Sequence, residues 1–454
     1  MSFKVLTSLI PKLSLDGFSK GFKTRYRGSL LHSKKMLLST FDGVGNPAMN
    51  TIYPVLPGEL TAHFQLKTGQ SFTGGSFGAN TASMGEAVFS TSLVGYPESM
   101  TDPSYKGQIL VFTHPIIGSN GVPPRDRDEY GLLKYFEAEQ IQCSGIVVSD
   151  YSVNYSHWNA VQSLSDWCWK SGIPAITGLD TRSLVQLLRS QGSTLGALNV
   201  GSKKLDIGNE VQWFDPTDGN LVDKVSIKNL KVYNPSGSVN IGLIDCGTKN
   251  NIIRLLCKSG ARVTVLPWDY DFVPVIDKFD GLFISNGPGS PSFCQKTIEN
   301  LKKAFEVYHR PIFGICMGNQ LLGMAAGFHI LRLPYGNRGH NQPVIELESG
   351  KCMITSQNHS FALDDSFVPE GWTRSFVNAN DGSNEGVRHL TKPFYSVQFH
   401  PEARGGPLDA NYMISQFVND VVKHKDSEWH QSEARLFDSQ LGLEKSSKLQ
   451  MDLK

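Results

Sequence analysis

Several features that define whole classes of protein are missing from this sequence. No apolar run reaches the roughly 20 residues that a membrane-spanning helix needs, so we expect no membrane partner. The formal net charge of +1 over 454 residues gives no electrostatic reason to expect a nucleic-acid partner. The seven cysteines are odd in number, scattered and without a CxxC pair, which favours a reducing compartment over a disulfide framework or a zinc site.

Two nucleotide-binding signatures are also absent. The apolar run 239–245 is followed by a turn at Gly247 but not by GxGxxG, which argues against a nicotinamide site, and the chain contains no P-loop. We therefore expect neither a cofactor nor a metal in this chain. The composition, 40% apolar and 19% charged, is typical of a globular protein with two or three domains.

What the sequence does contain is organised around a cysteine. The β-type run Pro311–Ile315 stops at Cys316, and small and apolar residues at helical spacing follow, so the pattern predicts strand, sharp turn and helix. Gly314 and Gly318 would relieve crowding at such a turn, and the N-terminus of the helix would favour a thiolate. A lone cysteine is more often buried and inert, so Cys316 needs partners before it is a candidate nucleophile.

Two other stretches supply those partners. A second β-type run, 394–399, ends at His400, and Glu402 follows at a spacing that lets its carboxylate orient the imidazole. A third run, 283–286, leads into the turn Gly287-Pro288-Gly289, whose backbone amides suit an oxyanion. Each stretch alone is weak evidence. Together they predict a Cys-His-Glu triad.

In this order the three stretches resemble the class I glutamine amidotransferase family. Four more stretches are similar to the small, glutaminase-bearing subunit of carbamoyl-phosphate synthetase, of the mitochondrial animal-like type. They are Gly95–Tyr105, Gly178–Arg182, Asp245–Asn251 and Ser356–Phe361. The resemblance covers roughly residues 58–425, and its N-terminal half matters most because other class I amidotransferases lack it.

The expected fold is α/β. An N-terminal small-subunit domain of mixed β and α structure should precede an amidotransferase domain built on a doubly wound, mostly parallel sheet, with its site at the carboxyl ends of the strands. The expected divisions are a mitochondrial transit peptide at 1–45, the N-terminal domain at 58–200, a connecting segment at 201–238, the amidotransferase domain at 239–425 and a polar tail of unknown role at 426–454.

Local patterns place the elements of the first domain. Strands are expected at 63–69, 71–78, 85–91, 107–113 and 144–148, and helices around 130–140, 160–170 and 181–190.

The resemblance also implies roles for individual residues. Cys316, His400 and Glu402 would be catalytic, and the backbone N–H groups of Gly287 and Met317 would form the oxyanion hole. Glutamine would be held by Ser104, Gly287, Gly289, Met317, Gln320, Asn358, Ser360 and Phe361. Two positions depart from the family: Ser360 stands where glycine is common, and Asn319 where many members have histidine.

The implied function is a glutaminase that supplies ammonia to the large, ATP-grasp subunit or domain of carbamoyl-phosphate synthetase. ATP, Mg and bicarbonate are expected on that partner. One alternative is a catalytically silent regulatory module of an ammonia-dependent synthase, which the presence of all three triad residues disfavours. Another is a peptidase or γ-glutamyl hydrolase, which the N-terminal domain disfavours. The pathway (arginine, urea or pyrimidine) and the possibility of a truncated fused gene stay open.

The first forty residues differ from the rest of the chain. Their only acid is Asp16, and serines and apolar residues are interleaved with eight basic residues, Lys4, Lys12, Lys20, Lys23, Arg25, Arg27, Lys34 and Lys35. This composition is typical of a mitochondrial transit peptide and predicts the mitochondrial matrix. The alternative is a disordered basic arm on a cytoplasmic protein.

Overall fold

The computed structural model describes residues 58, 60–201, 213, 215 and 218–428. All of them belong to one compact unit, Pro54–Lys454. The expected transit peptide, 1–45, and almost all of the expected tail, 426–454, lie outside the described residues. In the part of the chain that is described, no helix combines the length and apolar character needed to cross a membrane.

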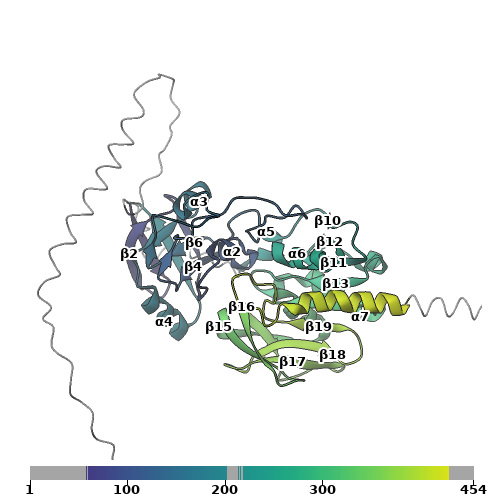
Figure 1. Ribbon diagram of the computed structural model, residues 1–454. Helices are drawn as coiled ribbons and strands as arrows, with labels where there is room; N and C mark the ends of the chain where they lie inside the picture. Colours follow the sequence, from purple (N-terminus) through teal and green to yellow (C-terminus); the bar gives the residue numbers. More distant parts are fainter. Residues whose placement is uncertain (1–57, 59, 202–212, 214, 216–217, 429–454) are drawn as a thin grey trace, which may run out of the picture. The chain divides into compact units, whose positions relative to one another are not determined.

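The N-terminal domain is a closed barrel with the strand order β1-β2-β8-β6-β4-β3-β9 (Figure 1). Its strands are β1 (Thr61–Leu66), β2 (Ser71–Ser76), β3 (Ala82–Ser90), β4 (Gln108–Phe112), β6 (Gly145–Val147), β8 (Ala175–Thr177) and β9 (Thr194–Val200), with a separate pair β5 (Ile116–Ile117) and β7 (Asp150–Tyr151). Its helices are α2 (Tyr96–Thr101), the 3-10 turn η1 (Pro103–Tyr105), α3 (Leu164–Lys170) and α4 (Thr181–Gln191).

Alternation of apolar and polar residues explains the barrel. In β1, Ala62, Phe64 and Leu66 are fully buried and their neighbours are not, as expected for a strand with one face on a core. Within the barrel, strands β3, β4, β6 and β8 pair in parallel, and the other neighbouring strands pair antiparallel. The five strands expected in this domain are all present, and the helices expected around 160–170 and 181–190 are α3 and α4.

The prediction of a helix around 130–140 is wrong. Residues 126–137 instead form an irregular segment, here called the bridging loop. The Asp128 carboxylate accepts hydrogen bonds from the backbone N–H groups of Tyr130 and Leu132, which fixes a turn. The loop sends Leu132 into the core of the second domain, and Leu133 and Phe136 into the core of the barrel side. Those apolar residues therefore serve two separate cores rather than one helical face.

The second domain is built on a ten-stranded sheet with the order β10-β12-β11-β13-β14-β19-β18-β17-β15-β16. Its strands are β10 (Lys231–Tyr233), β11 (Val239–Asp245), β12 (Ala261–Pro267), β13 (Gly281–Ile284), β14 (Ile312–Ile315), β15 (His329–Glu346), β16 (Cys352–Asp364), β17 (Trp372–Asn378), β18 (Asn384–His389) and β19 (Phe394–Val397). Its helices are α5 (Leu221–Val225), α6 (Asn250–Lys258), η3 (Val273–Lys278), η4 (Pro291–Phe293), α7 (Gln295–Val307) and α8 (Met317–Ala326), together with helical residues 412–428.

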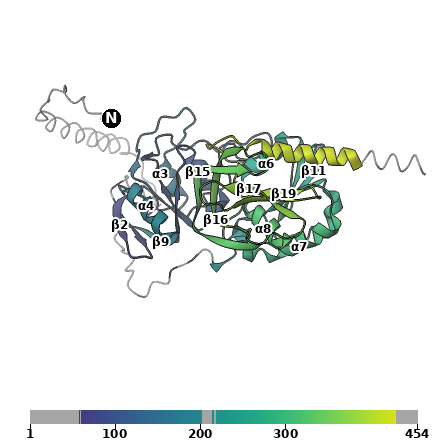
Figure 2. The same ribbon diagram turned by 90° about the horizontal axis from the view of Figure 1, so that it is seen from below.

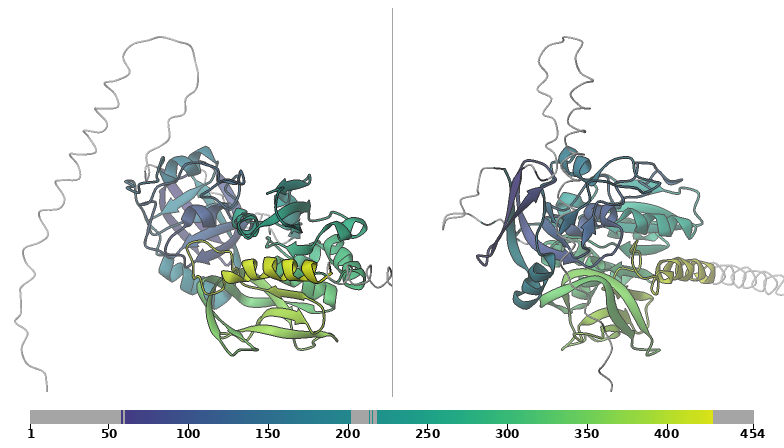
Figure 3. Two further views of the ribbon diagram at one scale, coloured as in Figure 1. Left: turned by 45° about the vertical axis from the view of Figure 1, so that its right-hand side comes forward. Right: turned by 60° about the vertical axis from the view of Figure 1, so that its left-hand side comes forward.

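The α/β fold class is confirmed, and the sheet is doubly wound. Strands β12, β11, β13, β14 and β19 pair in parallel, and antiparallel strands extend the sheet at both edges. Helix α6 and residues 412–428 pack on one face, whereas α7 and α8 pack on the other, as Figure 2 shows. Figure 3 shows residues 412–428 (yellow) alongside the sheet in two further views. The carboxyl ends of the parallel strands meet at one edge, where a site is expected.

The second half of the expected connecting segment contributes to this sheet. That segment contains helix α5 and strand β10, and β10 pairs antiparallel with β12 as an edge strand of the sheet. The polar and turn-rich sequence of 201–238 concealed so short a strand, because three residues are too few to show an alternation.

Candidate active site

The predicted strand, turn and helix around Cys316 are present. Cys316 lies between β14 and α8 with φ 55° and ψ −101°, a conformation that few residues with a side chain adopt. The backbone approaches closely on both sides: a Cβ atom on Gly314 would lie 2.6 Å from the Gly318 carbonyl oxygen, and one on Gly318 would lie 2.2 Å from that of Ile284. The two glycines therefore allow the tight turn that presents the sulfur at the carboxyl edge of the sheet.

His400 and Glu402 follow β19, the neighbour of β14. The His400 Nδ1 lies 2.7 Å from the Glu402 Oε1, and both side chains are buried. The other ring nitrogen, Nε2, has no hydrogen-bond partner in the described protein. It is therefore available to the sulfur of Cys316, with which the imidazole interacts. The Cys316 sulfur also lies 3.9 Å from the Asn358 carbonyl oxygen.

Electrostatic interactions favour the charged form of the histidine. Burial and the Lys249 charge lower the pKa of His400, but the Glu402 carboxylate and the Cys316 sulfur outweigh them and raise it to about 9. Burial raises the pKa of Glu402, but the charges of Lys249 and His400 have the larger effect and lower it to about 2. A protonated imidazole beside a cysteine is the arrangement that activates cysteine nucleophiles.

A buried lysine, which the sequence interpretation did not single out, completes this cluster. The Lys249 ammonium lies 2.9 Å from Glu402 Oε1, 3.1 Å from Asp102 Oδ2 and 3.2 Å from His400 Nδ1. Lys249 directly precedes α6, and Asp102 precedes η1 of the N-terminal domain. Both residues lie inside stretches that carried the family resemblance, and that was the one signal in the sequence that pointed to them.

All of the predicted glutamine-binding residues line one narrow pocket together with Cys316. The complete lining is Glu86, Ser104, Gln108, Gly287, Pro288, Gly289, Cys316, Met317, Gln320, Arg338, Asn358, His359, Ser360 and Phe361. Glu86, Gln108 and Arg338 were not predicted. They lie on β3, β4 and β15, so only the fold brings them to the pocket.

The N-terminal domain closes one side of this pocket through Ser104. The Asp102 carboxylate accepts a hydrogen bond from the Ser104 backbone N–H at 2.9 Å, which starts the η1 turn. The Ser104 hydroxyl in turn accepts a hydrogen bond from the Asn286 amide at 2.8 Å. Asn286 precedes Gly287, so this contact joins Ser104 to the predicted oxyanion turn.

The two predicted oxyanion donors both line the pocket. Met317 is the first residue of α8, so its N–H has no acceptor within the helix. The Gly287 N–H makes no backbone hydrogen bond within the described residues. A Cβ atom on Gly287 would lie 2.1 Å from the Cys246 carbonyl oxygen, so this position has no room for a side chain. The geometry leaves both donors free to meet negative charge.

The two departures from the family pattern are accommodated differently. The Ser360 hydroxyl lies 2.6 Å from the Arg338 guanidinium and accepts a hydrogen bond from it. Asn319 is fully buried away from the pocket, where its amide donates to Gln398 at 3.0 Å and accepts from Ser396 at 2.8 Å. Asn319 is therefore a satisfied core residue.

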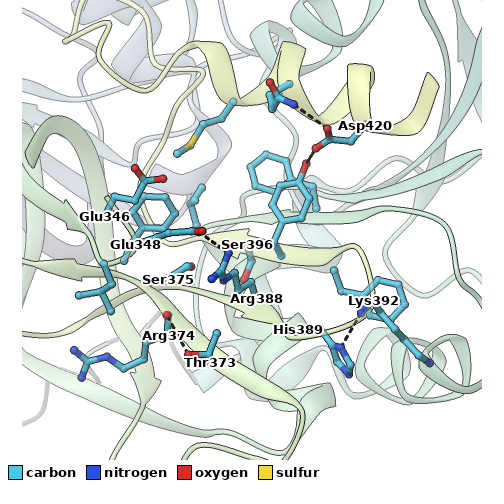
Figure 4. A pocket seen from close by; sticks show the side chains of 18 of the residues that line it. Glu346, Glu348, Thr373, Arg374, Ser375, Arg388, His389, Lys392, Ser396 and Asp420 are labelled. Atoms are coloured by element: carbon cyan, nitrogen blue, oxygen red, sulfur yellow. Dashed lines mark hydrogen bonds and ion pairs between the residues drawn. The ribbon is translucent and has the colours of Figure 1, made fainter. Parts of the chain in front are cut away.

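A larger cavity of about 1030 Å³ lies against the same sheet but contains none of the predicted site residues. Figure 4 shows the side chains that line it, with Glu348 and Arg388 pointing toward each other. Arg388 pairs with Glu348 at 2.6 Å, and Asp420 accepts hydrogen bonds from Tyr395 and Gln416 at 3.0 and 2.8 Å. Size alone therefore does not identify the site, and the chemistry lies at the narrower pocket.

Comparisons with known families agree with this architecture. The model for glutamine amidotransferase class-I matches residues 242–420, and the model for the carbamoyl-phosphate synthase small chain, CPSase domain, matches residues 64–198. The chain is thus a class I amidotransferase domain preceded by a small-chain domain. A solved glutamine amidotransferase from Thermotoga maritima superposes with a TM-score of 0.31 and 14% identity, over 43% of this chain and 85% of its own.

Curated relatives narrow the class. The arginine-specific small chain of carbamoyl phosphate synthase from Chaetomium globosum is 51% identical over 85% of this chain and 84% of its own length. The one from Neurospora crassa is 53% identical over 81% of each chain, and the one from Phaeosphaeria nodorum is 52% identical over 82% of this chain and 77% of its own. The chain belongs to the family of carbamoyl-phosphate synthase small chains.

Proposed function

We propose that this chain is the glutamine-hydrolysing component of a carbamoyl-phosphate synthase. The observation that carries the proposal is the convergence of a strained cysteine elbow, a buried His400–Glu402 pair and a narrow polar pocket. Family membership supports it. The direct test compares glutamine hydrolysis by the natural protein with that of Cys316→Ser, which keeps the shape of the side chain but lacks the thiol. Equal rates would contradict the proposal.

In the proposed reaction the Cys316 sulfur attacks the side-chain amide carbon of glutamine. The tetrahedral oxyanion, held by the Gly287 and Met317 N–H groups, collapses to a thioester and releases ammonia. The proton of the Cys316 thiol resides on His400, which gives it to the leaving amine and, then neutral, activates the water that hydrolyses the thioester to glutamate. Glu402 keeps the imidazole in place. No step requires a metal or cofactor.

The partner we propose is the large, ATP-grasp subunit or domain of carbamoyl-phosphate synthetase, which would hold ATP, Mg and bicarbonate and consume the ammonia. The fungal relatives are named arginine-specific, so we propose that the product serves arginine synthesis; urea and pyrimidine synthesis stay predictions. Kinship to the mitochondrial animal-like type also stays a prediction. Co-purification of a tagged chain with a synthetase subunit, or its absence, tests the partner.

A catalytically silent regulatory module is the alternative. It is disfavoured because Cys316, His400 and Glu402 lie together and the His400 Nε2 has no other hydrogen-bond partner in the described protein. A silent module would give the same background ammonia release with and without Cys316.

We further propose that residues 1–45 direct the protein to the mitochondrial matrix. The basic and serine-rich composition of that segment supports the proposal. A fluorescent protein fused to residues 1–45 should enter mitochondria, and a matched fusion with the eight basic residues replaced by glutamine should stay in the cytosol. Cytosolic fluorescence from the unaltered fusion would contradict the proposal and favour the cytoplasmic alternative.

A further inference from the structure

Two oppositely charged, buried side chains line the glutamine pocket. Glu86 comes from β3 of the N-terminal barrel and Arg338 from β15 of the amidotransferase domain, and their exposed fractions are 6% and 4%. The Arg338 guanidinium lies 3.7 Å from Glu86 Oε1, which is an ion pair but too long for a hydrogen bond. Burial of two charges at this distance is unfavourable unless further hydrogen bonds compensate.

Those further bonds are incomplete within the described protein. Glu86 Oε2 accepts a hydrogen bond from Gln108 at 2.7 Å, and Arg338 donates to Ser360 at 2.6 Å and to the Tyr335 carbonyl at 3.1 Å. Glu86 Oε1 and Arg338 Nε are buried without a hydrogen-bond partner. Because unpaired buried polar atoms are costly, the pair is suited to a ligand that supplies both a donor and an acceptor.

Glutamine has both groups at the end opposite its amide. Glu86 and Arg338 line the same narrow pocket as Cys316. A substrate whose amide carbon meets the sulfur must place its α-ammonium and α-carboxylate elsewhere in that pocket. A carboxylate is the natural partner of an ammonium, and a guanidinium is the natural partner of a carboxylate.

We propose that Glu86 binds the α-ammonium of glutamine and that Arg338, supported by Ser360, binds its α-carboxylate. The inference rests on the proposed glutaminase function and adds the groups that restrict the enzyme to free amino acids. It also assigns a role to the serine at position 360: the Ser360 hydroxyl holds one arm of the guanidinium. Specificity then depends on a residue from each domain.

The first test removes one charge from the enzyme and the matching charge from the substrate. Glu86→Gln keeps the shape of the side chain and its contact with Gln108. Its kcat/KM for glutamine should fall by at least about tenfold. For glutaramate, the analogue without an α-amino group, kcat/KM should stay within about twofold of the natural enzyme, because glutaramate has no α-ammonium that Glu86 could bind.

The second test is the mirror image. Arg338→Met should lower kcat/KM for glutamine by at least about tenfold but leave 4-aminobutanamide, the analogue without an α-carboxylate, within about twofold. Arg338→Lys keeps the charge without the planar fork and should recover part of the activity on glutamine. Arg374→Met is the matched control, because Arg374 pairs with Asp365 at 3.0 Å outside the glutamine pocket. This variant should leave kcat/KM unchanged for both glutamine and 4-aminobutanamide.

Losses of equal size on all three substrates would overturn the inference and leave Glu86 and Arg338 as an ion pair that joins β3 to β15. Calorimetric binding of the same three ligands to Cys316→Ser protein repeats the comparison without turnover. If the natural protein bound glutamine but did not hydrolyse it, the proposed function would be wrong and the inference about binding would still stand. If Glu86→Gln also left the preference for binding glutamine over glutaramate unchanged, the inference would be wrong as well. Thermal unfolding verifies that each variant is folded.

Discussion

At the scale of single residues, reactivity should separate Cys316 from the other cysteines. Five of them are buried, and burial raises the pKa of each: Cys143, Cys168, Cys246, Cys257 and Cys294. Cys352 is exposed and has no histidine partner among the described contacts. Cys316 lies beside the His400–Glu402 pair, so we expect it to be the most reactive of the seven.

A glutamine-like chloroketone should alkylate Cys316 first, and free glutamine should slow that reaction. Iodoacetamide, which does not need the pocket, serves as the control and should modify the exposed Cys352 as well. Mass spectrometry of peptides after brief labelling measures both reactions. A chloroketone adduct found mainly on another cysteine would show that Cys316 is not the nucleophile.

The pH dependence of hydrolysis reports on the charge of His400. Its pKa is raised to about 9, so the imidazolium persists through neutral pH and is lost above that value. We expect kcat/KM to fall as the pH rises through about 9. Glu402→Gln removes a negative neighbour that favours the charged imidazole, so the alkaline limb should move to lower pH and kcat should decrease. An unchanged limb would mean that another group controls it.

At the scale of elements, helix α6 depends on the bridging loop for its start. The Glu137 carboxylate accepts a hydrogen bond from the Asn251 N–H at 2.9 Å, and the Glu137 carbonyl accepts one from the Asn250 N–H at 2.9 Å. The N-terminal N–H groups of a helix have no intrahelical acceptors, so this contact caps α6 from the other domain. Lys249, directly before α6, is positioned by the same contact.

Glu137→Ala should destabilise the protein by about 1 to 2 kcal/mol, the usual effect of losing a helix cap. Because Lys249 holds Glu402 and His400, kcat should decrease more than KM increases. Glu139→Ala is the matched control two residues away: Glu139 pairs with Arg125 and Arg127 on the surface, so its loss should matter little. Denaturant unfolding and steady-state kinetics measure both variants; equal effects would contradict a capping role.

Elements with a strong local pattern were predictable from the sequence. The cysteine elbow, α4 and five of the seven barrel strands follow directly from alternation, helical spacing and glycine placement, whereas β8 and β9 were not predicted. The bridging loop and β10 were not, because one divides its apolar residues between two cores and the other is three residues long. Lys249, Glu86 and Arg338 were missed for a related reason: they lie on separate elements, and only the topology of the fold brings each of them to the site.

At the scale of the whole molecule, the proposed reaction releases ammonia for a synthetase partner to consume, so we expect the activity of the chain to depend on that partner. The Gly287–Gly289 turn is a suitable point of control, because Gly289 has φ 80° and glycine tolerates a peptide flip that withdraws an oxyanion donor. The isolated chain should hydrolyse glutamine slowly.

Adding a carbamoyl-phosphate synthetase large subunit with ATP and bicarbonate should raise kcat by at least about tenfold, which corresponds to about 1.4 kcal/mol of barrier. Steady-state glutaminase assays with and without the partner measure this. A change confined to KM would indicate altered glutamine binding instead. Full activity of the isolated chain, unaffected by any such partner, would describe a free-standing glutaminase.

The bridging loop has a consequence for how the protein loses its structure. Leu132 is 3% exposed and packs in the amidotransferase core, while its neighbour Leu133 is fully buried on the barrel side. The N-terminal domain cannot melt without withdrawing Leu132 from the amidotransferase core and leaving the cavity that it filled, and melting of the amidotransferase domain leaves Leu132 without its apolar surroundings. Scanning calorimetry should therefore record a single endotherm, as if two domains that differ in architecture were one thermodynamic body.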